Sequence, residues 1–459
     1  MTVNRRLLVS TGLVSSGLAL GALLPTATVA AGPRAKDAVT AAADTTVTPN
    51  TGTDQSKALQ AAIDRAAERG AILTLPPGRY LAQGLRLRAG SHIRGTPGRT
   101  ILAHGSPGTL ITGDNADRAR LEGLAIEGGA HALTGSDHAG LVAITRSRGL
   151  VLIDLQVQGS RANGIVLEGC SGSVRDCSVA GSAQAGILSL DAVGLEIVHN
   201  IVSDCANNGI LVWRSTAGED GTIVAHNRIE RIRAEAGGTG QNGNGVNVFR
   251  AGNVLVTGNR ISDCAYSAVR GNAASNIQMI GNTCSRLGEV ALYAEFGFEG
   301  ALIASNIVDT AATGISVTNF NEGGRLAVVQ GNLVRNLVRR EHEPEDKRGE
   351  GIAVEADTVV TGNSIENAAT VGISIGWGVY MREVVATSNV IRKSRVGIMI
   401  TRDPGAGAAL IAQNMISGTR DGAIRAMDKG LAVGPELVRG GVQSSRITIA
   451  GNVGVDAGA

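Results

Sequence analysis

An asparagine that recurs at the same place in a short repeated unit constrains the fold of this chain more than any other feature. In each unit apolar positions flank a polar one, the asparagine follows, and a further apolar position comes after it. Leu155 and Cys177 occupy the same place in two earlier units. The asparagines stand at Asn200, Asn227, Asn259, Asn282, Asn306, Asn332, Asn363, Asn389, Asn414 and Asn452. A period in the low to middle twenties, lengthened by insertions, is typical of one coil of a β-solenoid.

A second anchor follows the asparagine position in most units, as Gly followed by Ile or Val. Examples are Gly164-Ile165, Gly209-Ile210, Gly351-Ile352 and Gly397-Ile398. The residues after it alternate between apolar and polar, which is typical of a strand with one buried face. Two or three such strands per coil, stacked ~4.8 Å apart, predict an all-β fold, a parallel β-helix with one aliphatic core.

The regularity of the asparagines favours a structural role. An inward-facing Asn at one turn of every coil can hydrogen-bond to the backbone and to the next amide along the stack. We therefore interpret the ten asparagines as a scaffold ladder and not as a binding site.

The region before the repeats predicts a cap, which we assign to residues 51–83, with the repeats running over 84–459. Residues 54–69 have apolar positions at helical spacing, and Gly70 ends the pattern. The strand 71–75 and the turn Pro76-Pro77-Gly78-Arg79-Tyr80 follow. A solenoid needs its open end covered, and an amphipathic helix can cover it.

The first 31 residues have the order of an export signal. Arg5 and Arg6 precede a mildly apolar run, 7–24, and a small-residue stretch ends at Ala31. The arginine pair resembles a twin-arginine signal, which implies passage through the Tat translocon and a periplasmic or secreted protein. A membrane anchor is the alternative, because the run has about the minimum spanning length. We expect residues 32–50 to be a linker and the mature protein not to span a membrane.

These features together resemble a known fold family. The helix, strand and Pro-Pro-Gly-x-Tyr turn are similar to the N-terminal cap of the pectate-lyase-like superfamily of right-handed β-helices, which includes polysaccharide lyases, hydrolases and epimerases. With Arg5 and Arg6, the whole chain resembles a functionally uncharacterised family of twin-arginine-translocated repetitive proteins. The resemblance implies fold and export, and it carries no catalytic signature.

Charge and cysteine usage exclude several function classes. The formal net charge is +2 and the first 31 residues contribute two arginines and no acid, which leaves 2 − 2 = 0 for the remainder. Nucleic acid and acidic membranes normally require a clustered basic face, so neither is an expected partner. Five cysteines without CxxC spacing fit neither a disulfide scaffold nor a zinc site.

Histidines give no clear metal signature, and we predict no cofactor. His199 and His226 precede ladder asparagines in consecutive coils, so they can stack ~5 Å apart. A metal pair is one interpretation and a structural or surface role is the other. Nothing near Asp137-His138 completes a catalytic triad.

The outer face of the middle coils is the candidate site. Residues two and four positions past the anchor glycine form outward rows that are rich in aromatic, amide and charged groups. Such groups suit a polysaccharide or cell-envelope glycan. The predicted binding residues are Trp213, Arg214, Asn247, Phe249, Arg250 and Asn272. Insertions at 234–244 and 339–350 are candidate walls of a groove, although the second is also compatible with solvated surface.

Four residues are candidates for catalysis: Glu295, Arg270, Tyr293 and Glu355. Glu295 and Glu355 share a row two coils apart, ~9 to 10 Å at the backbone, close to the carboxylate separation of inverting glycoside hydrolases. A lyase would instead use Arg270 or Tyr293 as its base. A non-catalytic β-helix that binds a glycan or another protein is the alternative to both.

Overall fold

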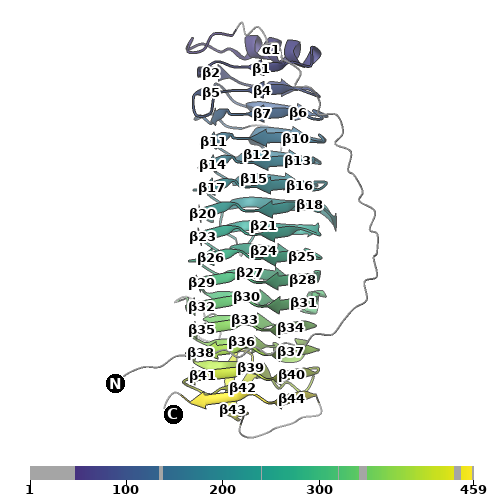
Figure 1. The fold of residues 1–459 in the computed structure, drawn as a ribbon, viewed down its shortest axis with the longest axis vertical. Coiled ribbons are helices and arrows are strands. Elements are labelled where there is room, and N and C mark those ends of the chain that lie inside the picture. The colour runs from purple at the N-terminus through teal and green to yellow at the C-terminus, as the bar shows by residue number, and fades with distance from the viewer. Residues whose placement is uncertain are drawn as a thin grey trace, which may run out of the picture. The chain divides into compact units, whose positions relative to one another are not determined.

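The computed structural model describes residues 47–133, 138–238, 240–318, 320–340, 349–438 and 446–456. The predicted signal peptide, Asp137 and residues 341–348 of the charged insertion lie outside these ranges. Within them the predicted fold is confirmed: the chain is a right-handed parallel β-helix, and its coils contribute one strand to each of three sheets (Figure 1).

Sheet 1 contains the first strand of each coil, and its neighbours pair in parallel. Its strands are β1 (Ile72–Thr74), β4 (His92–Arg94), β7 (Arg120–Glu122), β10 (Leu150–Ile153), β13 (Gly172–Arg175), β16 (Leu195–Val198), β19 (Ile223–Ala225), β22 (Leu255–Thr257), β25 (Ile277–Ile280), β28 (Glu299–Ala304), β31 (Arg325–Gln330), β34 (Thr358–Thr361), β37 (Val384–Thr387), β40 (Ala409–Ala412) and β44 (Ile447–Ala450).

Sheet 2 follows after the asparagine corner, and it is also parallel. Its strands are β2 (Gly78–Ala82), β5 (Thr100–His104), β8 (Ala125–Glu127), β11 (Gln156–Gln158), β14 (Ser178–Ala180), β17 (Ile201–Ser203), β20 (Arg228–Ile232), β23 (Arg260–Cys264), β26 (Thr283–Ser285), β29 (Ile307–Ala311), β32 (Leu333–Leu337), β35 (Ser364–Ala368), β38 (Val390–Arg392), β41 (Met415–Thr419) and β45 (Val453–Asp456).

Sheet 3 carries the candidate site on its outer face. Its strands are β3 (Leu85–Leu87), β6 (Ile111–Asp114), β9 (Gly140–Thr145), β12 (Asn163–Glu168), β15 (Ala185–Leu190), β18 (Asn208–Glu219), β21 (Asn244–Gly252), β24 (Val269–Asn272), β27 (Val290–Glu295), β30 (Thr313–Val317), β33 (Glu350–Val354), β36 (Val371–Ile375), β39 (Val396–Thr401), β42 (Ile424–Asp428) and β43 (Leu431–Glu436). Short 3-10 helices follow two of these strands: η1 (Phe320–Glu322) and η2 (Gly378–Tyr380).

The core is a stack of aliphatic side chains, because each inward position of a strand lies over its equivalent in the next coil. Ile210, Ile315 and Ile352 are fully buried members of the row that follows the anchor glycine. Glycine is required at this anchor because the backbones of neighbouring coils approach closely: a Cβ at Gly351 would lie 2.3 Å from the carbonyl oxygen of Gly372. The Gly-Ile pair therefore combines a tight corner with a core side chain.

The asparagine ladder lies between sheets 1 and 2 and is buried from Asn200 to Asn414, whereas Asn452 at its end is partly exposed. Asn306 is typical. Its Nδ2 donates to the carbonyl of Met279 at 2.8 Å and to Oδ1 of Asn332 at 3.0 Å. Its own Oδ1 accepts from the backbone nitrogen and from Nδ2 of Asn282. These hydrogen bonds satisfy polar groups that the turn would otherwise bury unpaired.

The helix α1 (Ser56–Glu68) buries Leu59, Ala62, Ile63 and Ala66 and contacts the first strands of the β-helix. The buried Tyr80 donates from its hydroxyl to the carbonyl of Pro76 at 3.0 Å, which explains the Pro-Pro-Gly-x-Tyr turn. The three sheets begin with β1, β2 and β3, so coils start at residue 72, before the boundary predicted at 84.

The last strands of sheet 3 depart from the repeat. β43 pairs antiparallel with β42 and forms a hairpin at the end of the sheet, which the repeat did not predict. Among the described residues, no helix is long and apolar enough to cross a membrane.

Candidate functional site

Two neighbouring cavities lie on the outer face of sheet 3. We call the first the aromatic cavity. It has a volume of about 310 Å³, and its lining residues are Trp213, Gln241, Asn247, Phe249, Arg270, Asn272 and Phe296. We call the second the carboxylate cavity. It has a volume of about 410 Å³, and its lining residues are Glu289, Val290, Tyr293, Thr313, Ser316, Thr318, Glu350, Ala353, Val354, Glu355, Ser374, Gly376 and Trp377.

The strand register aligns these residues in two rows. Trp213, Phe249, Asn272 and Glu295 are partners in consecutive coils. In the second row, Asn247, Arg270, Tyr293, Ser316, Ala353 and Ser374 are partners across six coils. Both rows match those expected from the spacing after the anchor glycine.

The aromatic cavity combines flat apolar rings with amide groups. The rings of Trp213 and Phe249 meet edge to face, with centroids 6.1 Å apart. Phe296, which is 37% exposed, comes directly after β27 and has a positive φ of 60°. The backbone of the glycine-rich insertion forms one wall, because the carbonyl of Gln241 accepts from Nδ2 of Asn247 at 3.2 Å.

A buried ion pair lies between the two cavities. The guanidinium of Arg270 donates to Glu295 from Nε and Nη2, and Asn272 donates to the same carboxylate from Nδ2 at 3.0 Å. Arg270 also lies over the ring of Tyr293, 5.4 Å from the guanidinium carbon to the ring centroid. Arg270 is 7% exposed and Glu295 2%. Arg270, a lining residue of the aromatic cavity, thus contacts Tyr293, a lining residue of the carboxylate cavity.

Burial has the largest effect on the pKa values of Tyr293 and Glu295. It raises the pKa of Tyr293 to about 12. It also raises the pKa of Glu295 above its ordinary value, an effect that Arg270 beside it opposes. A phenol with so high a pKa is a poor base at neutral pH, and Arg270 is held by Glu295. The geometry therefore does not favour the lyase scheme in which either residue removes a proton.

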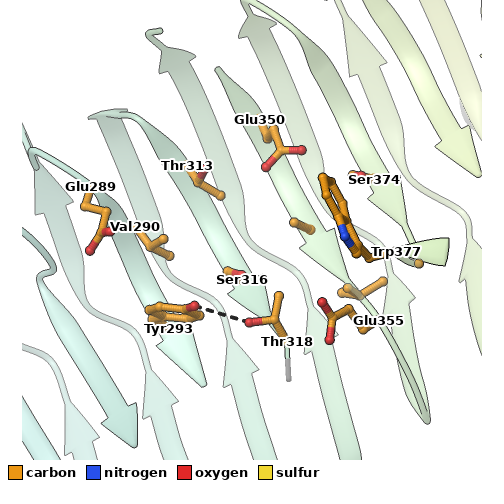
Figure 2. Close-up of a pocket in the computed structure, with 13 residues that line it drawn as sticks. Glu289, Val290, Tyr293, Thr313, Ser316, Thr318, Glu350, Glu355, Ser374 and Trp377 are labelled. Carbon is orange, nitrogen blue, oxygen red and sulfur yellow. Dashed lines mark hydrogen bonds between the residues drawn. The ribbon is translucent and has the colours of Figure 1, made fainter. Parts of the chain in front are cut away.

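Carboxylates line two opposite edges of the second cavity. Figure 2 shows Glu289, Thr313 and Glu350 along one edge, and Tyr293, Thr318 and Glu355 along the other. The hydroxyl of Thr318 donates to that of Tyr293 at 3.3 Å. Trp377 stands at the end of the cavity near Ser374.

The structure brings most of the predicted site residues together, although in two cavities. Trp213, Asn247, Phe249, Arg270 and Asn272 line the aromatic cavity, and Tyr293 and Glu355 line the carboxylate cavity. Glu295 lines neither. Arg214 and Arg250 also line neither; Arg250 lies over the outer face of the Phe249 ring, 4.7 Å from the centroid.

One expectation needs correction. The outward rows predicted exposed side chains, yet Asn247, Arg270 and Glu295 are buried. The cause is crowding: neighbours in a row are one strand spacing apart, ~4.8 Å, and the insertion covers this part of the sheet. The closest packing is at Gly240, where a Cβ would lie 1.3 Å from Nη1 of Arg270.

Several lining residues were not among the predicted binding or catalytic residues, including Gln241, Glu289, Phe296, Glu350 and Trp377. Glu350 comes one position before the anchor Gly351, a row that the sequence-based search did not include. The same row contains Asn163, Asn208 and Asn244, where Asn244 donates from Nδ2 to Oδ1 of Asn208 at 3.2 Å. Gln241 and Glu350 lie in the insertions 234–244 and 339–350, which the sequence predicted as candidate walls, although neither was predicted as an individual site residue. Phe296 and Trp377 follow their strands and carry no such signal.

Comparisons with known proteins agree with the fold. Residues 216–380 match the family model described as the right-handed beta helix region, and residues 95–286 match that of the periplasmic copper-binding protein NosD. Neither match covers half of the chain; with the observed architecture, they make the chain similar to the right-handed β-helices of the pectate-lyase-like superfamily.

Solved structures share the fold at low sequence identity. Gene product 12 of bacteriophage phi29 is 13% identical, with a TM-score of 0.51 over 90% of this chain and 56% of the phage protein. Its N-terminal fragment is 13% identical, with a TM-score of 0.52 over 89% and 70%. The chain thus spans about half the length of the phage protein.

The residues matched to the NosD model do not fit a copper site. All five cysteines fall in this range and are buried free thiols. Burial raises the pKa of Cys177 and Cys284 to about 12, which disfavours the thiolate that a metal requires. His199 and His226 stack with ring centroids 5.3 Å apart. Within the described part of the chain, no three His, Cys, Asp or Glu side chains gather as a metal site.

Proposed function

We propose that this protein binds a polysaccharide along the outer face of sheet 3, across the aromatic and carboxylate cavities. The observation that carries the proposal is the alignment of two chemically different cavities in the same two rows. From the coil of Trp213 to that of Trp377 there are six strand spacings, ~29 Å in total. A surface of this length suits a polymer better than a small metabolite.

The chemistry of the lining groups supports a sugar ligand. Sugars present apolar ring faces and many hydroxyl groups, and aromatic rings with amides and carboxylates complement both. Trp213 and Phe249 offer rings, and Asn247 and Asn272 offer amides. Cavities of a few hundred Å³ with convergent polar groups are also the usual form of ligand sites.

Hydrolysis is a second candidate, favoured by the carboxylates. Glu289 and Glu350 lie on the same edge of the cavity two coils apart, which places their backbones roughly 10 Å from each other. Inverting glycosidases hold their acid and base ~6.5 to 9.5 Å apart, with a water molecule on the far side of the sugar. In this scheme one of Glu350 and Glu289 takes a proton from water as its oxygen bonds to the anomeric carbon, and the other gives a proton to the glycosidic oxygen as its bond to that carbon breaks. Glu355 binds hydroxyl groups from the opposite edge, and Glu295 positions Arg270.

We infer that the protein is exported to the periplasm or secreted through the Tat translocon. The support is the Arg5-Arg6 pair with the apolar run after it. The NosD model that matches residues 95–286 also describes a periplasmic protein. Export of an already folded β-helix is consistent with a scaffold whose stability depends on complete stacking of its coils.

Calorimetric titration of residues 32–459 with a panel of purified polysaccharides tests the binding proposal. We expect saturable binding to at least one glycan, and Phe249→Ala should weaken it by about tenfold because a stacking ring is lost. Ile307→Ala, which removes an exposed apolar side chain from sheet 2, is the matched control. If no glycan binds, or if both variants bind as the wild type does, the proposal is wrong.

An assay for new reducing ends with the bound glycan tests hydrolysis. We expect Glu350→Gln to abolish release and to keep binding, because an amide cannot exchange the proton. Glu196→Gln on the exposed face of sheet 1 should behave as the wild type does. Binding without release of reducing ends would leave a glycan-binding protein without catalysis, and unsaturated uronides would indicate a lyase instead.

A further inference from the structure

Two residues that line the aromatic cavity each carry a buried nitrogen donor without a hydrogen-bond partner in the described part of the chain. One is Nε1 of Trp213, and the other is Nη1 of Arg270. The Arg270 side chain is 9% exposed, and its Nε and Nη2 donate to Glu295. Two unpaired donors on one cavity wall are unusual in a protein interior, and they point to a hydrogen-bond acceptor in the ligand.

The charge balance of the cavity selects the kind of acceptor. Among the described residues that line the cavity, Arg270 is the one with a charge, and Glu295 neutralises it. The other polar lining groups are the amides Gln241, Asn247 and Asn272. A ligand carboxylate would lose its water without meeting a spare cation, and it would lie close to Glu295. The cavity therefore favours a neutral acceptor.

The aromatic rings of the cavity indicate which chemical group is attached to the hydrogen-bond acceptor of the ligand. Phe249, Phe296 and the ring of Trp213 supply an apolar lining, which favours burial of a small apolar group. A sugar hydroxyl supplies an acceptor without an apolar group. An acetamido group supplies both, because its carbonyl oxygen accepts and its methyl group is apolar.

Resting on the glycan-binding function proposed above, we propose that the aromatic cavity binds the acetamido group of an N-acetylated amino-sugar polymer. The carbonyl oxygen accepts from Nε1 of Trp213 and Nη1 of Arg270, and the methyl group packs on Phe249 and Phe296. Because Gly240 packs against Nη1, binding displaces the insertion locally. Four insertion glycines with positive φ, at 237, 238, 240 and 243, give its backbone that freedom.

The two tryptophans of the chain allow the cavities to be observed separately. Trp213 lines the aromatic cavity and Trp377 the carboxylate cavity. Trp377→Phe leaves Trp213 as the only indole, and Trp213→Phe leaves Trp377. The ligands are three β-1,4-linked hexasaccharides that differ only at carbon 2, those of N-acetylglucosamine, glucosamine and glucose. Fluorescence titration gives an affinity for each ligand at each cavity.

In the Trp377→Phe protein, we expect the acetylated hexamer to change the fluorescence of Trp213. It should bind at least about tenfold more tightly than the hexamers of glucosamine and glucose, because one or two hydrogen bonds and a buried methyl group are gained. Trp213→Phe keeps a ring but loses the N–H, so the preference should fall to about threefold in that variant when followed through Trp377.

Two outcomes would overturn the acetamido assignment while leaving glycan binding intact. One is equal affinity for the three hexamers at Trp213. The other is a response from Trp377 alone. If neither indole responds to these hexamers and calorimetry finds no glycan ligand, the proposed function fails as well. A preference for the acetylated hexamer that survives unchanged in Trp213→Phe would also count against the assigned hydrogen bond.

Discussion

The asparagine corner and the outer face of sheet 3 are built by the same coils, yet they differ in regularity. At the corner, ten coils place an asparagine at the same position, and those from Asn200 to Asn414 each donate to the asparagine of the next coil, as Asn282 and Asn306 show. On sheet 3, successive coils place Trp213, Phe249, Asn272 and Glu295 at equivalent positions. Repetition thus marks the part that holds the coils together, and variation marks the part that is free to bind a ligand.

The comparison also separates two uses of buried polarity. Each ladder asparagine is satisfied by its neighbours in the stack, so the ladder is closed to ligands. Near sheet 3, Arg270 and Trp213 each keep one N–H without a partner. Buried polar atoms without a partner also occur elsewhere in the described residues, for example at Ser189 and Asp220, and Arg270 and Trp213 differ from these because they line a cavity.

The largest effect on stability should come from breaking the buried ion pair. Arg270→Met leaves the carboxylate of Glu295 buried and unpaired, and we expect a loss of about 3 to 5 kcal/mol in the free energy of unfolding, measured with urea. Arg231→Met, which breaks an exposed pair with Asp204, should cost about 0 to 1 kcal/mol. Equal losses in the two variants would show that the pair near sheet 3 is no more buried than a surface pair.

A ladder substitution should rank second. Asn306→Ala leaves buried backbone and amide groups of two adjacent coils unpaired, and we expect a loss of about 2 to 4 kcal/mol in the free energy of unfolding. Asn452→Ala is the control, because this last ladder residue is partly exposed and water can replace its hydrogen bonds. A small loss at Asn306, similar to that at Asn452, would contradict the scaffold role of the ladder.

A substitution at Phe296 should affect binding of the glycan more than the stability of the fold. Its ring is partly exposed at the aromatic cavity, so Phe296→Ala should change the free energy of unfolding by about 1 kcal/mol or less. The same substitution should weaken binding of the glycan by roughly five- to tenfold, because an aromatic contact is lost. Calorimetry and urea denaturation of one preparation check both values. A large loss of stability with unchanged affinity would place Phe296 in the scaffold.

The smallest effect should be the reactivity of the cysteines in the folded protein. Their burial raises the pKa of Cys205 to about 11 and that of Cys177 to about 12, so at pH 8 even less thiolate forms than in an ordinary cysteine. We expect no reaction of the folded protein with Ellman's reagent at pH 8 and five thiols after unfolding in urea. Rapid reaction of the native protein would show that a cysteine is accessible.

The repeat predicted the fold because its signal is cumulative. The asparagine and Gly-Ile positions recur in many coils, so insertions such as 234–244 did not obscure the period. The helix before β1 and the turn at Tyr80 were likewise predictable, since both are local. The hairpin β42–β43 was not, because it departs from the repeat at the end of the stack.

The candidate site was predictable in part. Once the period is known, the rows follow, and Trp213, Phe249 and Arg270 were found in this way. Sequence could not show that Glu295 is buried under Arg270, because burial here depends on neighbouring coils and on the insertion. Phe296 and Trp377 lie after their strands, where the repeat no longer fixes the direction of a side chain.

Affinity as a function of glycan chain length tests most directly whether one ligand spans both cavities. The coils of Phe249 and Glu355 are four strand spacings apart, ~19 Å. We predict that affinity rises steeply until the oligosaccharide reaches this length, and that Phe249→Ala and Glu355→Gln both weaken binding of the long oligosaccharide. If a disaccharide binds as tightly as the longest chain, or if neither variant weakens binding of the long chain, the cavities do not form one polysaccharide site.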